Sequence, residues 1–271
     1  MSEVREPSVT GVFSARPDGA TSVALALAAR LSEVHRVLAI DLNLERPELA
    51  TLLDLDESPN VYQLAYQSRL SAVRGDELEA HVQWHEGMGV LTGSWFSSSQ
   101  REEISDHFVD GLLTTAAASF DHVILDLGRT RGELPTALVG NTLAWVVTPS
   151  PLGMAALDSS VRQLEALGCE WIGSAKVVLN RVSDRSWRGV ERFIEREYGM
   201  EVAGQVPLAA EFWQEAEISH SLRALRVPIP DRKRFVRAYG ADAWLVRQAL
   251  DKLAEALPEP RQTPSVRAAE V

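Results

Sequence analysis

The polar residues of this sequence that are best suited to chemistry each follow a short apolar run. Residues 14–22 form a loop after the first run, Asp41 ends a second, Asp126 ends a third and Asn180 ends a fourth. A glycine-containing loop that leads into a helix can point backbone N–H groups at a phosphate. An Asp at the end of an apolar strand is common, so each of these features alone is a weak signal. Four of them, after four apolar runs and in this order, are more specific.

These residues can act together only if the fold places them side by side. Apolar, mostly β-branched runs predict strands at residues 9–15, 36–41, 89–93, 122–127, 143–148, 176–181 and 202–207. Stretches of helical length lie between them, at residues 20–31, 101–118, 154–167, 186–198 and 241–257. Continuous apolar runs are typical of buried parallel strands. The alternation predicts an α/β fold, with a doubly wound, mostly parallel sheet flanked by helices, in which ligands bind beyond the carboxyl ends of the strands.

The chain of 271 residues is long enough for one large α/β domain or two small ones. No linker-like segment interrupts the alternation, so we expect a single domain over residues 1–257. Residues 258–271 are rich in proline and poor in large apolar side chains. Such a composition cannot bury much apolar surface, so we predict a disordered tail there.

Composition narrows the classes of protein and of site. The formal net charge of -11 argues against a basic nucleic-acid binder, and the most basic segment, residues 231–240, is predicted to be a solvated turn before the last helix. No apolar run is long enough to span a membrane, and the first residues lack the apolar core of a signal peptide. We therefore expect a cytoplasmic protein. The single cysteine, Cys169, excludes an internal disulfide framework and a multi-cysteine zinc site.

The basic residues are almost all arginine, and this limits the possible mechanisms. Lysine occurs only at Lys176, Lys233 and Lys252. Any mechanism that needs a local lysine in the N-terminal half of the chain is therefore excluded.

The order of the polar features resembles that of the ParA/MinD family of deviant P-loop ATPases. The loop of that family, roughly K-G-G-x-G-K-T-[ST], aligns with residues 15–22 and matches at Gly19, Thr21 and Ser22. A later V-x-N-R segment, whose Asn contacts adenine in the family, matches residues 178–181, and the resemblance spans residues 9–228. The resemblance implies Mg²⁺ on Thr21 and Asp126, and a nucleotide on Arg16, Asp18, Gly19, Ala20, Thr21, Ser22, Asp41, Asn180 and Arg181.

The chain departs from the family pattern where the family carries out catalysis. Ala15 and Ala20 stand at both lysine positions of the loop, and Arg16-Pro17 stands at two glycine positions. Loss of a preorganised cation of this kind typically lowers the rate of phosphoryl transfer by ~10²–10⁵-fold. Asn43 stands where the family has a water-positioning Asp, and an amide cannot accept the proton of that water. We therefore assign no catalytic residue and expect a degenerate Walker A loop in a pseudo-ATPase that hydrolyses ATP at or below background.

Within the family, the chain most resembles the CpaE/TadZ pilus-assembly group, on residues 121–139, 146–160 and 176–183. This resemblance implies a homodimeric scaffold for localisation or assembly of a Flp/Tad-type pilus or secretion system. Its partners would be proteins of that machine, which recruit it to a pole or to the inner face of the membrane. The cofactor would be ATP with Mg²⁺, and a site without any cofactor is left open.

Two other functions remain open at this point. The first is a slow ATPase of the MinD/ParA type that cycles on membrane or DNA. The mixed charge of the last helix and the acidic net charge give no strong signal for either surface. The second is a partner-binding protein that needs no nucleotide. The aromatic residues Trp95 and Phe96 would favour it if they are exposed, because exposed aromatics mark interfaces, whereas the alternative is that they form a hydrophobic plug over the edge of the sheet.

Overall fold

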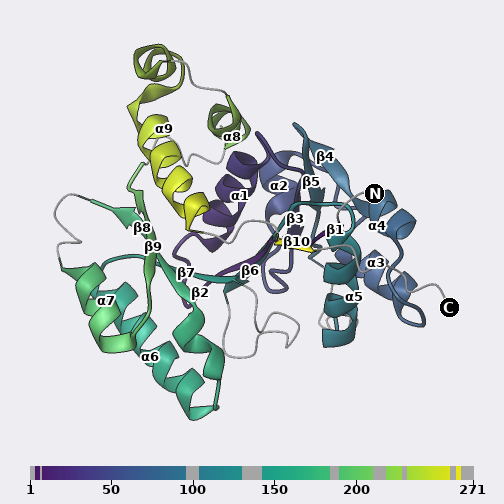
Figure 1. Ribbon diagram of the computed structural model, residues 1–271, viewed down its shortest axis with the longest axis horizontal. Coiled ribbons are helices and arrows are strands. Elements are labelled where there is room, and N and C mark those ends of the chain that lie inside the picture. Colours follow the sequence, from purple (N-terminus) through teal and green to yellow (C-terminus); the bar gives the residue numbers. More distant parts are fainter. Residues whose placement is uncertain are drawn as a thin grey trace.

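The computed structural model describes residues 4–6, 8–95, 104–129, 142–183, 189–209, 218–227, 231–256 and 261–263. Its centre is an eight-stranded sheet that crosses the middle of Figure 1. In spatial order its strands are β4 (Gln83–His85), β5 (Met88–Leu91), β3 (Val37–Asp41), β6 (His122–Arg129), β2 (Ser8–Ser14), β7 (Thr142–Val147), β8 (Lys176–Val182) and β9 (Val202–Pro207). Neighbours pair in parallel except β4, which is antiparallel to β5. The predicted mostly parallel α/β sheet is confirmed.

Helices cover both faces of the sheet (Figure 1). One face carries α1 (Ala20–Leu31), α2 (Leu49–Leu53), α8 (Ile218–Arg226) and α9 (Arg232–Glu255). The other carries α3 (Val61–Ser68), α4 (Gly75–His81), α5 (Asp106–Ala117), α6 (Pro151–Ala166), the 3₁₀ turn η3 (Glu170–Ser174) and α7 (Val190–Tyr198). Because both faces are covered, the central strands are apolar at most of their positions, which explains their nearly continuous apolar runs.

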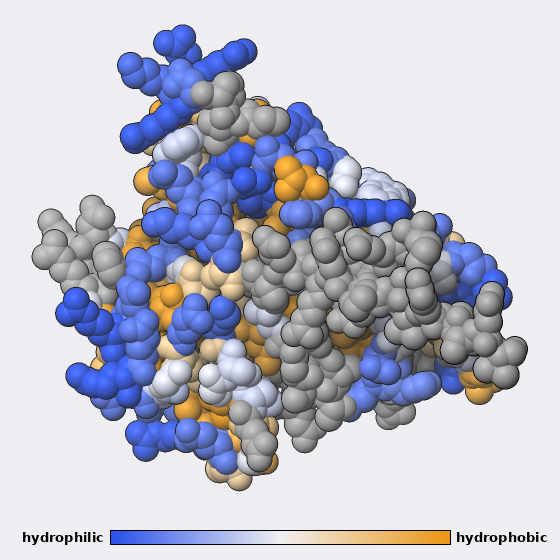
Figure 2. All heavy atoms as spheres, in the orientation of Figure 1, coloured by the Kyte–Doolittle hydropathy of each residue, from blue (hydrophilic) through white to orange (hydrophobic). Residues whose placement is uncertain are grey.

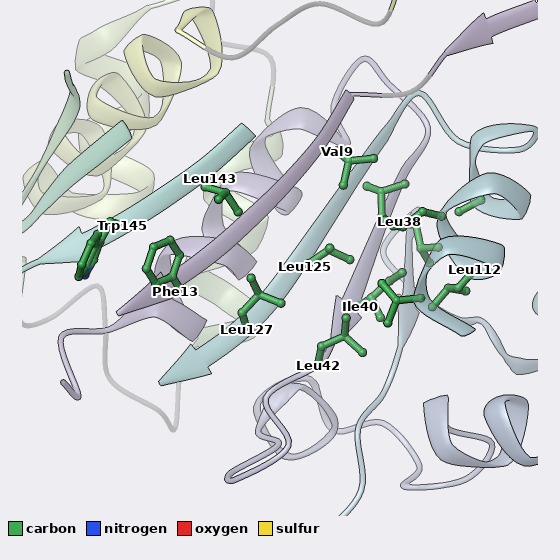
Figure 3. Close-up of a cluster of buried hydrophobic side chains, with 14 of the residues drawn as sticks. Val9, Phe13, Leu38, Ile40, Leu42, Leu112, Leu125, Leu127, Leu143 and Trp145 are labelled. Carbon is green, nitrogen blue, oxygen red and sulfur yellow. The ribbon is translucent and has the colours of Figure 1, made fainter. Parts of the chain in front are cut away.

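The core consists of two apolar clusters separated by the sheet. On the face of α5, Phe13 packs against Trp145 with ring centroids 5.0 Å apart, and Leu112 lies at the other end of the same cluster, near Leu38 and Ile40 (Figure 3). On the other face, α1 lies against β6 and is itself covered by α8 and α9. Nearly every residue of α1 is buried. A helix that is apolar on all sides is a central helix, so the start of α1 is rigidly placed.

Every predicted strand is present, and the helix predicted at residues 20–31 matches α1. The prediction of a turn at residues 231–240 is wrong, because Asp231 Oδ1 accepts a hydrogen bond from the Lys233 N–H at 2.9 Å and starts α9 there. A kink at Gly240, whose φ is +89°, separates this part from the rest of α9. The later part packs on the core, and Figure 2 shows hydrophilic residues over the outer surface around α8 and α9. None of the helices in the described ranges carries an apolar stretch long enough to cross a bilayer.

Other boundaries differ from the predictions. The helix predicted at residues 101–118 begins at Asp106, after Ser105 accepts a hydrogen bond from the Phe108 N–H. Short elements between β3 and β5 were not predicted, namely α2, α3, α4 and β4. The predicted helix at residues 186–198 is described only from α7 onward.

A second, two-stranded sheet joins β1 (Val4–Glu6) to β10 (Arg261–Thr263) in antiparallel pairing. The predicted disordered tail therefore contains a short strand, which differs from the expectation because pairing with β1 supplies backbone partners that composition does not reveal. The other residues of 258–271 lie outside the described residues, so the prediction for the whole tail stays a prediction.

Candidate functional site

The carboxyl ends of the central strands bring the predicted polar residues to one edge of the sheet. Asp41, at the end of β3, lies in register with Asp126 in β6, and the loop after β2 follows the neighbouring strand. That loop also contacts β8, where Asn180 Nδ2 donates a hydrogen bond to the Asp18 carbonyl oxygen at 2.7 Å. The structure therefore places these residues together, as the sequence predicts.

Gly19 shapes the junction between the loop and α1. It precedes α1 with a φ of +88°, in the left-handed region that favours glycine. A Cβ at this position would lie 2.6 Å from Asn180 Nδ2. The first hydrogen bond within the helix runs from the Val23 N–H to the Gly19 carbonyl oxygen, so the N–H groups of Ala20, Thr21 and Ser22 have no partner within α1. They form the kind of helix N-terminus that binds anions.

Replacing Gly19 by alanine is expected to lower the free energy of unfolding by about 2–3 kcal/mol. Left-handed backbone accounts for about 1–2 kcal/mol, and displacement of the Asn180 hydrogen bond for about 1 kcal/mol more. Gly168→Ala is the matched control, since Gly168 has a φ of +75° but no atom within 4 Å of its Cβ position. Urea denaturation of both variants measures the difference. Equal losses would mean that the contact with Asn180 contributes nothing.

The loop before Gly19 uses part of its hydrogen-bonding capacity internally. The Ser14 hydroxyl donates to the Arg16 carbonyl oxygen at 2.5 Å, and the Asp18 N–H donates to the same oxygen at 2.7 Å. Pro17 has no N–H to donate. A phosphate at this loop would therefore meet fewer free backbone donors than a glycine-rich loop offers, and binding would depend more on the start of α1. Arg16 itself is partly buried.

Asp126 has one carboxylate oxygen that no hydrogen bond satisfies. Oδ1 accepts from the Gly128 N–H at 2.9 Å, while the buried Oδ2 has no hydrogen-bond partner among the described residues. Burial raises the pKa of Asp126 to about 6, although the nearby Thr21 hydroxyl and the Gly128 N–H lower it. The Thr21 hydroxyl is thus close to the carboxylate without forming a hydrogen bond of good geometry with it. An unpartnered, buried carboxylate oxygen is costly unless a cation or donor joins it.

The pair Thr21 and Asp126 fits Mg²⁺. Magnesium takes oxygen ligands and is commonly held by one or two carboxylates, water and the phosphates of a substrate. In the described parts of the chain no group of three or more His, Cys, Asp and Glu residues could hold a metal ion. A Mg²⁺ ion here would therefore need phosphate oxygens and water beside Thr21 and Asp126.

Both carboxylate oxygens of Asp41 accept hydrogen bonds from backbone N–H groups. Its Oδ1 accepts from the Asn43 N–H at 3.1 Å, and its Oδ2 accepts from the N–H groups of Glu48 and Leu49 at 3.0 Å each. Burial, followed by the charge of Asp126, holds the pKa of Asp41 well above its ordinary value, although the three N–H groups lower it. Asp41 thereby anchors the start of α2 and presents its carboxylate inward.

Asn43 is also held in place. Its Oδ1 accepts a hydrogen bond from the Arg46 N–H at 3.2 Å. Its side chain lies directly against Gly128, where a Cβ would be 2.1 Å from the Asn43 Cγ. Gly128 has a φ of +58°, so glycine is needed there both for the backbone and for the close approach of Asn43.

Asn180 holds the loop to the sheet. It is buried, and its Oδ1 accepts from the Arg181 N–H at 2.9 Å while its Nδ2 donates to Asp18. Arg181 is exposed, with a φ of +58°. The amide that would contact adenine in the resembled family therefore ties the loop to β8 in this structure, and Arg181 faces solvent at the edge of the site.

Two residues near the site were not predicted. Arg129, the last residue of β6, donates from Nε to the Ala15 carbonyl oxygen at 3.4 Å. Glu48 lies close enough to raise the pKa of Asp126 further and pairs with Arg46 at 2.7 Å. Arg129 could have been predicted from the sequence, because it is a charged residue at the end of an apolar run. Nothing in the sequence placed Glu48 near Asp126, because the turn between β3 and α2 sets that contact.

The predicted aromatic pair is described in part. Trp95 follows β5 and is 57% exposed. Phe96 lies outside the described residues. The exposed indole is compatible with an interface, and the interface stays a prediction.

No protein-family model and no curated protein matches the chain. Solved structures do match. A ParA family ATPase from Chlorobium tepidum is 21% identical with a TM-score of 0.67, over 92% of this chain and 99% of that one. MinD of Pyrococcus horikoshii, complexed with Mg-ADP, is 16% identical with a TM-score of 0.62, over 92% and 94%. MinD in the MinC:MinD complex of Aquifex aeolicus is 15% identical with a TM-score of 0.61, over 94% and 99%. These likenesses show that the chain has the fold of ParA and MinD ATPases.

Proposed function

We propose that this protein is a ParA/MinD-like scaffold that binds Mg-ATP and does not hydrolyse it. The observation that carries the proposal is the unpartnered Asp126 Oδ2 beside Thr21, at the open N-terminus of α1. These groups are suited to hold Mg²⁺ and a phosphate. Bound Mg²⁺ would neutralise charge on the phosphates. The MinD of Pyrococcus horikoshii was solved with Mg-ADP, which supports the same ligand class here.

The residues of this chain bind better than they catalyse. The N–H groups of Ala20 and Thr21 can orient a phosphate without any side-chain charge. Transfer of that phosphate needs preorganised cations, and Ala15 and Ala20 supply none. The Asn43 amide is fixed by the Arg46 N–H and by Gly128, and it cannot accept a proton from water. Binding without turnover follows from this combination.

A protein that binds ATP without consuming it can serve as a stable platform. We infer that it acts as a homodimer in the localisation or assembly of a pilus or secretion machine, as its resemblance to the CpaE/TadZ group implies. Recruitment by partner proteins would bring it to a pole or to the inner face of the membrane. The MinD of Aquifex aeolicus was solved with the partner MinC, which supports a protein partner for this fold.

A second function is favoured by the loop itself. The Asp18 N–H is bonded inside the loop, and Asn180 is bonded to the loop. A site whose donors are satisfied in this way can keep its shape without a nucleotide. The alternative is therefore a partner-binding protein whose assembly is independent of ATP.

Calorimetric titration with Mg-ATP, combined with mass measurement by light scattering, separates the two functions. The proposal expects saturable binding that is lost when Mg²⁺ is chelated, because Thr21 and Asp126 act through the metal. A stable dimer that binds no nucleotide at any concentration tested would select the alternative. A monomer that binds no nucleotide would overturn both.

A further inference from the structure

A β-bulge in β6 determines on which face of the sheet the side chain of its last residue, Arg129, lies. Where β6 pairs with β2, Asp126 lies opposite Val12, Gly128 lies opposite Phe13 and Arg129 lies opposite Ser14. Leu127 is thus an extra residue in β6. Side chains alternate along a strand, so residues 126 and 129 would face opposite sides of a regular strand. The extra residue shifts the alternation of side chains by one position. The side chain of Arg129 therefore lies on the same face of the sheet as that of Asp126, and this is the face that α1 covers.

The side chain of Arg129 reaches the loop. Its Nε donates to the carbonyl oxygen of Ala15, and Ala15 stands where the resembled family carries its characteristic lysine. The Arg129 side chain is exposed. Its guanidinium therefore lies at the rim of the site, beside the loop and on the side of the sheet where α1 begins.

No lysine precedes Lys176 in the sequence. Lys176 Nζ donates to the Ala256 carbonyl oxygen at 2.9 Å and pairs with Glu201 at 3.2 Å. Lys176 is the first residue of β8, whereas the site lies at the carboxyl ends of the parallel strands. Lys176 therefore lies at the opposite end of the strands from the site. A phosphate at the loop therefore has no lysine from the N-terminal half or from β8 to neutralise it, and arginine, Mg²⁺ and backbone N–H groups are the candidates that adjoin the loop.

We propose that Arg129 contacts the terminal phosphates of the bound polyphosphate and supplies charge for binding in place of the lysines of the resembled loop, while Asn43 still leaves the site without a carboxylate that could accept the proton of an attacking water. This proposal rests on the proposed function, because it names the cation of the same site. The guanidinium has five N–H donors. One of them is used on Ala15, and the planar fork can still bind two phosphate oxygens.

The experiment compares three variants by calorimetry, with Mg-ATP and with inorganic tripolyphosphate as probes. Arg129→Ala removes the charge and the hydrogen bond to Ala15. Arg129→Gln removes the charge but keeps an N–H donor for the Ala15 carbonyl oxygen. Arg162→Ala is the matched control, because Arg162 is an exposed arginine of α6 that pairs with Asp158 at 3.0 Å. Each protein is titrated at low and at high salt.

We expect both Arg129 variants to bind each probe on the order of tenfold to a hundredfold more weakly than the unmodified protein, as loss of a charged hydrogen bond implies. The control is expected to change affinity by less than about twofold, since exposed pairs contribute little. The affinity of the unmodified protein should also fall more steeply with salt than that of either variant, because exposed charges are screened.

The outcomes separate this proposal from the proposed function. Affinity retained by Arg129→Gln would mean that Arg129 only positions the loop and would overturn the proposal, while Mg-ATP binding would stand. Weak binding by both Arg129 variants, together with ATP turnover by the unmodified protein, would support the role of Arg129 and overturn the non-hydrolysing function. Failure of the unmodified protein to bind either probe would overturn both.

Discussion

Asp126→Asn is expected to stabilise the fold at neutral pH and to abolish Mg²⁺-dependent nucleotide binding. Burial raises the pKa of the Asp126 carboxyl from its ordinary value of 3.8 to about 6. At pH 7 Asp126 is therefore ionised in an environment that destabilises its negative charge in the folded state. The difference in pKa corresponds to about 3 kcal/mol. Asparagine can keep the hydrogen bond from the Gly128 N–H and carries no charge, so about 1–3 kcal/mol of stability should be gained.

The sign of the pH dependence follows from the same pKa. Between pH 3.8 and about 6 the folded protein binds more protons at Asp126 than the unfolded chain does, so this carboxyl makes stability fall as pH rises through that window. Asp126→Asn should therefore match the unmodified protein near pH 4 and exceed it above pH 6. Urea denaturation across this range, with and without Mg-ATP, measures both effects.

The control for Asp126→Asn is Asp76→Asn, because Asp76 is an exposed carboxylate that pairs with Arg74 at 2.7 Å. Its removal should leave the pH dependence and the effect of Mg-ATP unchanged. Destabilisation by Asp126→Asn at pH 7 would contradict the account of a strained, unpartnered carboxylate. Undiminished Mg-ATP binding by Asp126→Asn would contradict its role toward the metal.

Asp41→Ala is expected to destabilise the fold by about 3 kcal/mol or more. Asp41 accepts hydrogen bonds from the N–H groups of Asn43, Glu48 and Leu49. Alanine would leave these donors without their acceptor, and each buried unsatisfied donor costs about 1–3 kcal/mol. The charge that is removed was itself disfavoured, since burial and the charge of Asp126 raise the pKa of Asp41, so the net loss should lie at the lower end of that sum.

Asp41→Asn serves as the comparison, because the amide keeps one oxygen for one or two of the three N–H groups. We expect its free energy of unfolding to lie between those of the alanine variant and the unmodified protein. If Asp41→Ala changed stability by less than about 1 kcal/mol, the three hydrogen bonds would not anchor α2 as the structure indicates.

The sequence was sufficient to predict the sheet and the edge on which the site lies. The runs that became β3, β6 and β8 are apolar at most consecutive positions, a pattern that is typical of parallel strands covered on both faces. Asp41, Asp126 and Asn180 each end or nearly end such a run, so their common edge follows from the direction of parallel strands. The apolar content of α1 likewise predicted its limits without any tertiary information.

The contacts that set the chemistry could not be predicted in the same way. The bulge at Leu127 places Arg129 beside the loop, and it depends on pairing with β2 and on the approach of Asn43 to Gly128. The hydrogen bond from the Asn180 amide to Asp18, which lies far away in the sequence, was not predicted, and the contact of Asn180 with a base stays a prediction. Hydrophobic periodicity indicates which face of a helix or strand is buried. It does not indicate which residues from distant parts of the sequence contact each other.

What happens to bound ATP distinguishes a binding scaffold from an ATPase. Protein in excess over γ-labelled ATP with Mg²⁺ would be incubated, and released phosphate would be measured over hours, with Asp126→Ala in parallel. We expect ATP to be recovered intact, with phosphate release no faster in the unmodified protein than in the variant. Phosphate release that depends on the protein and is abolished by Asp126→Ala would contradict it and identify the protein as an active ATPase.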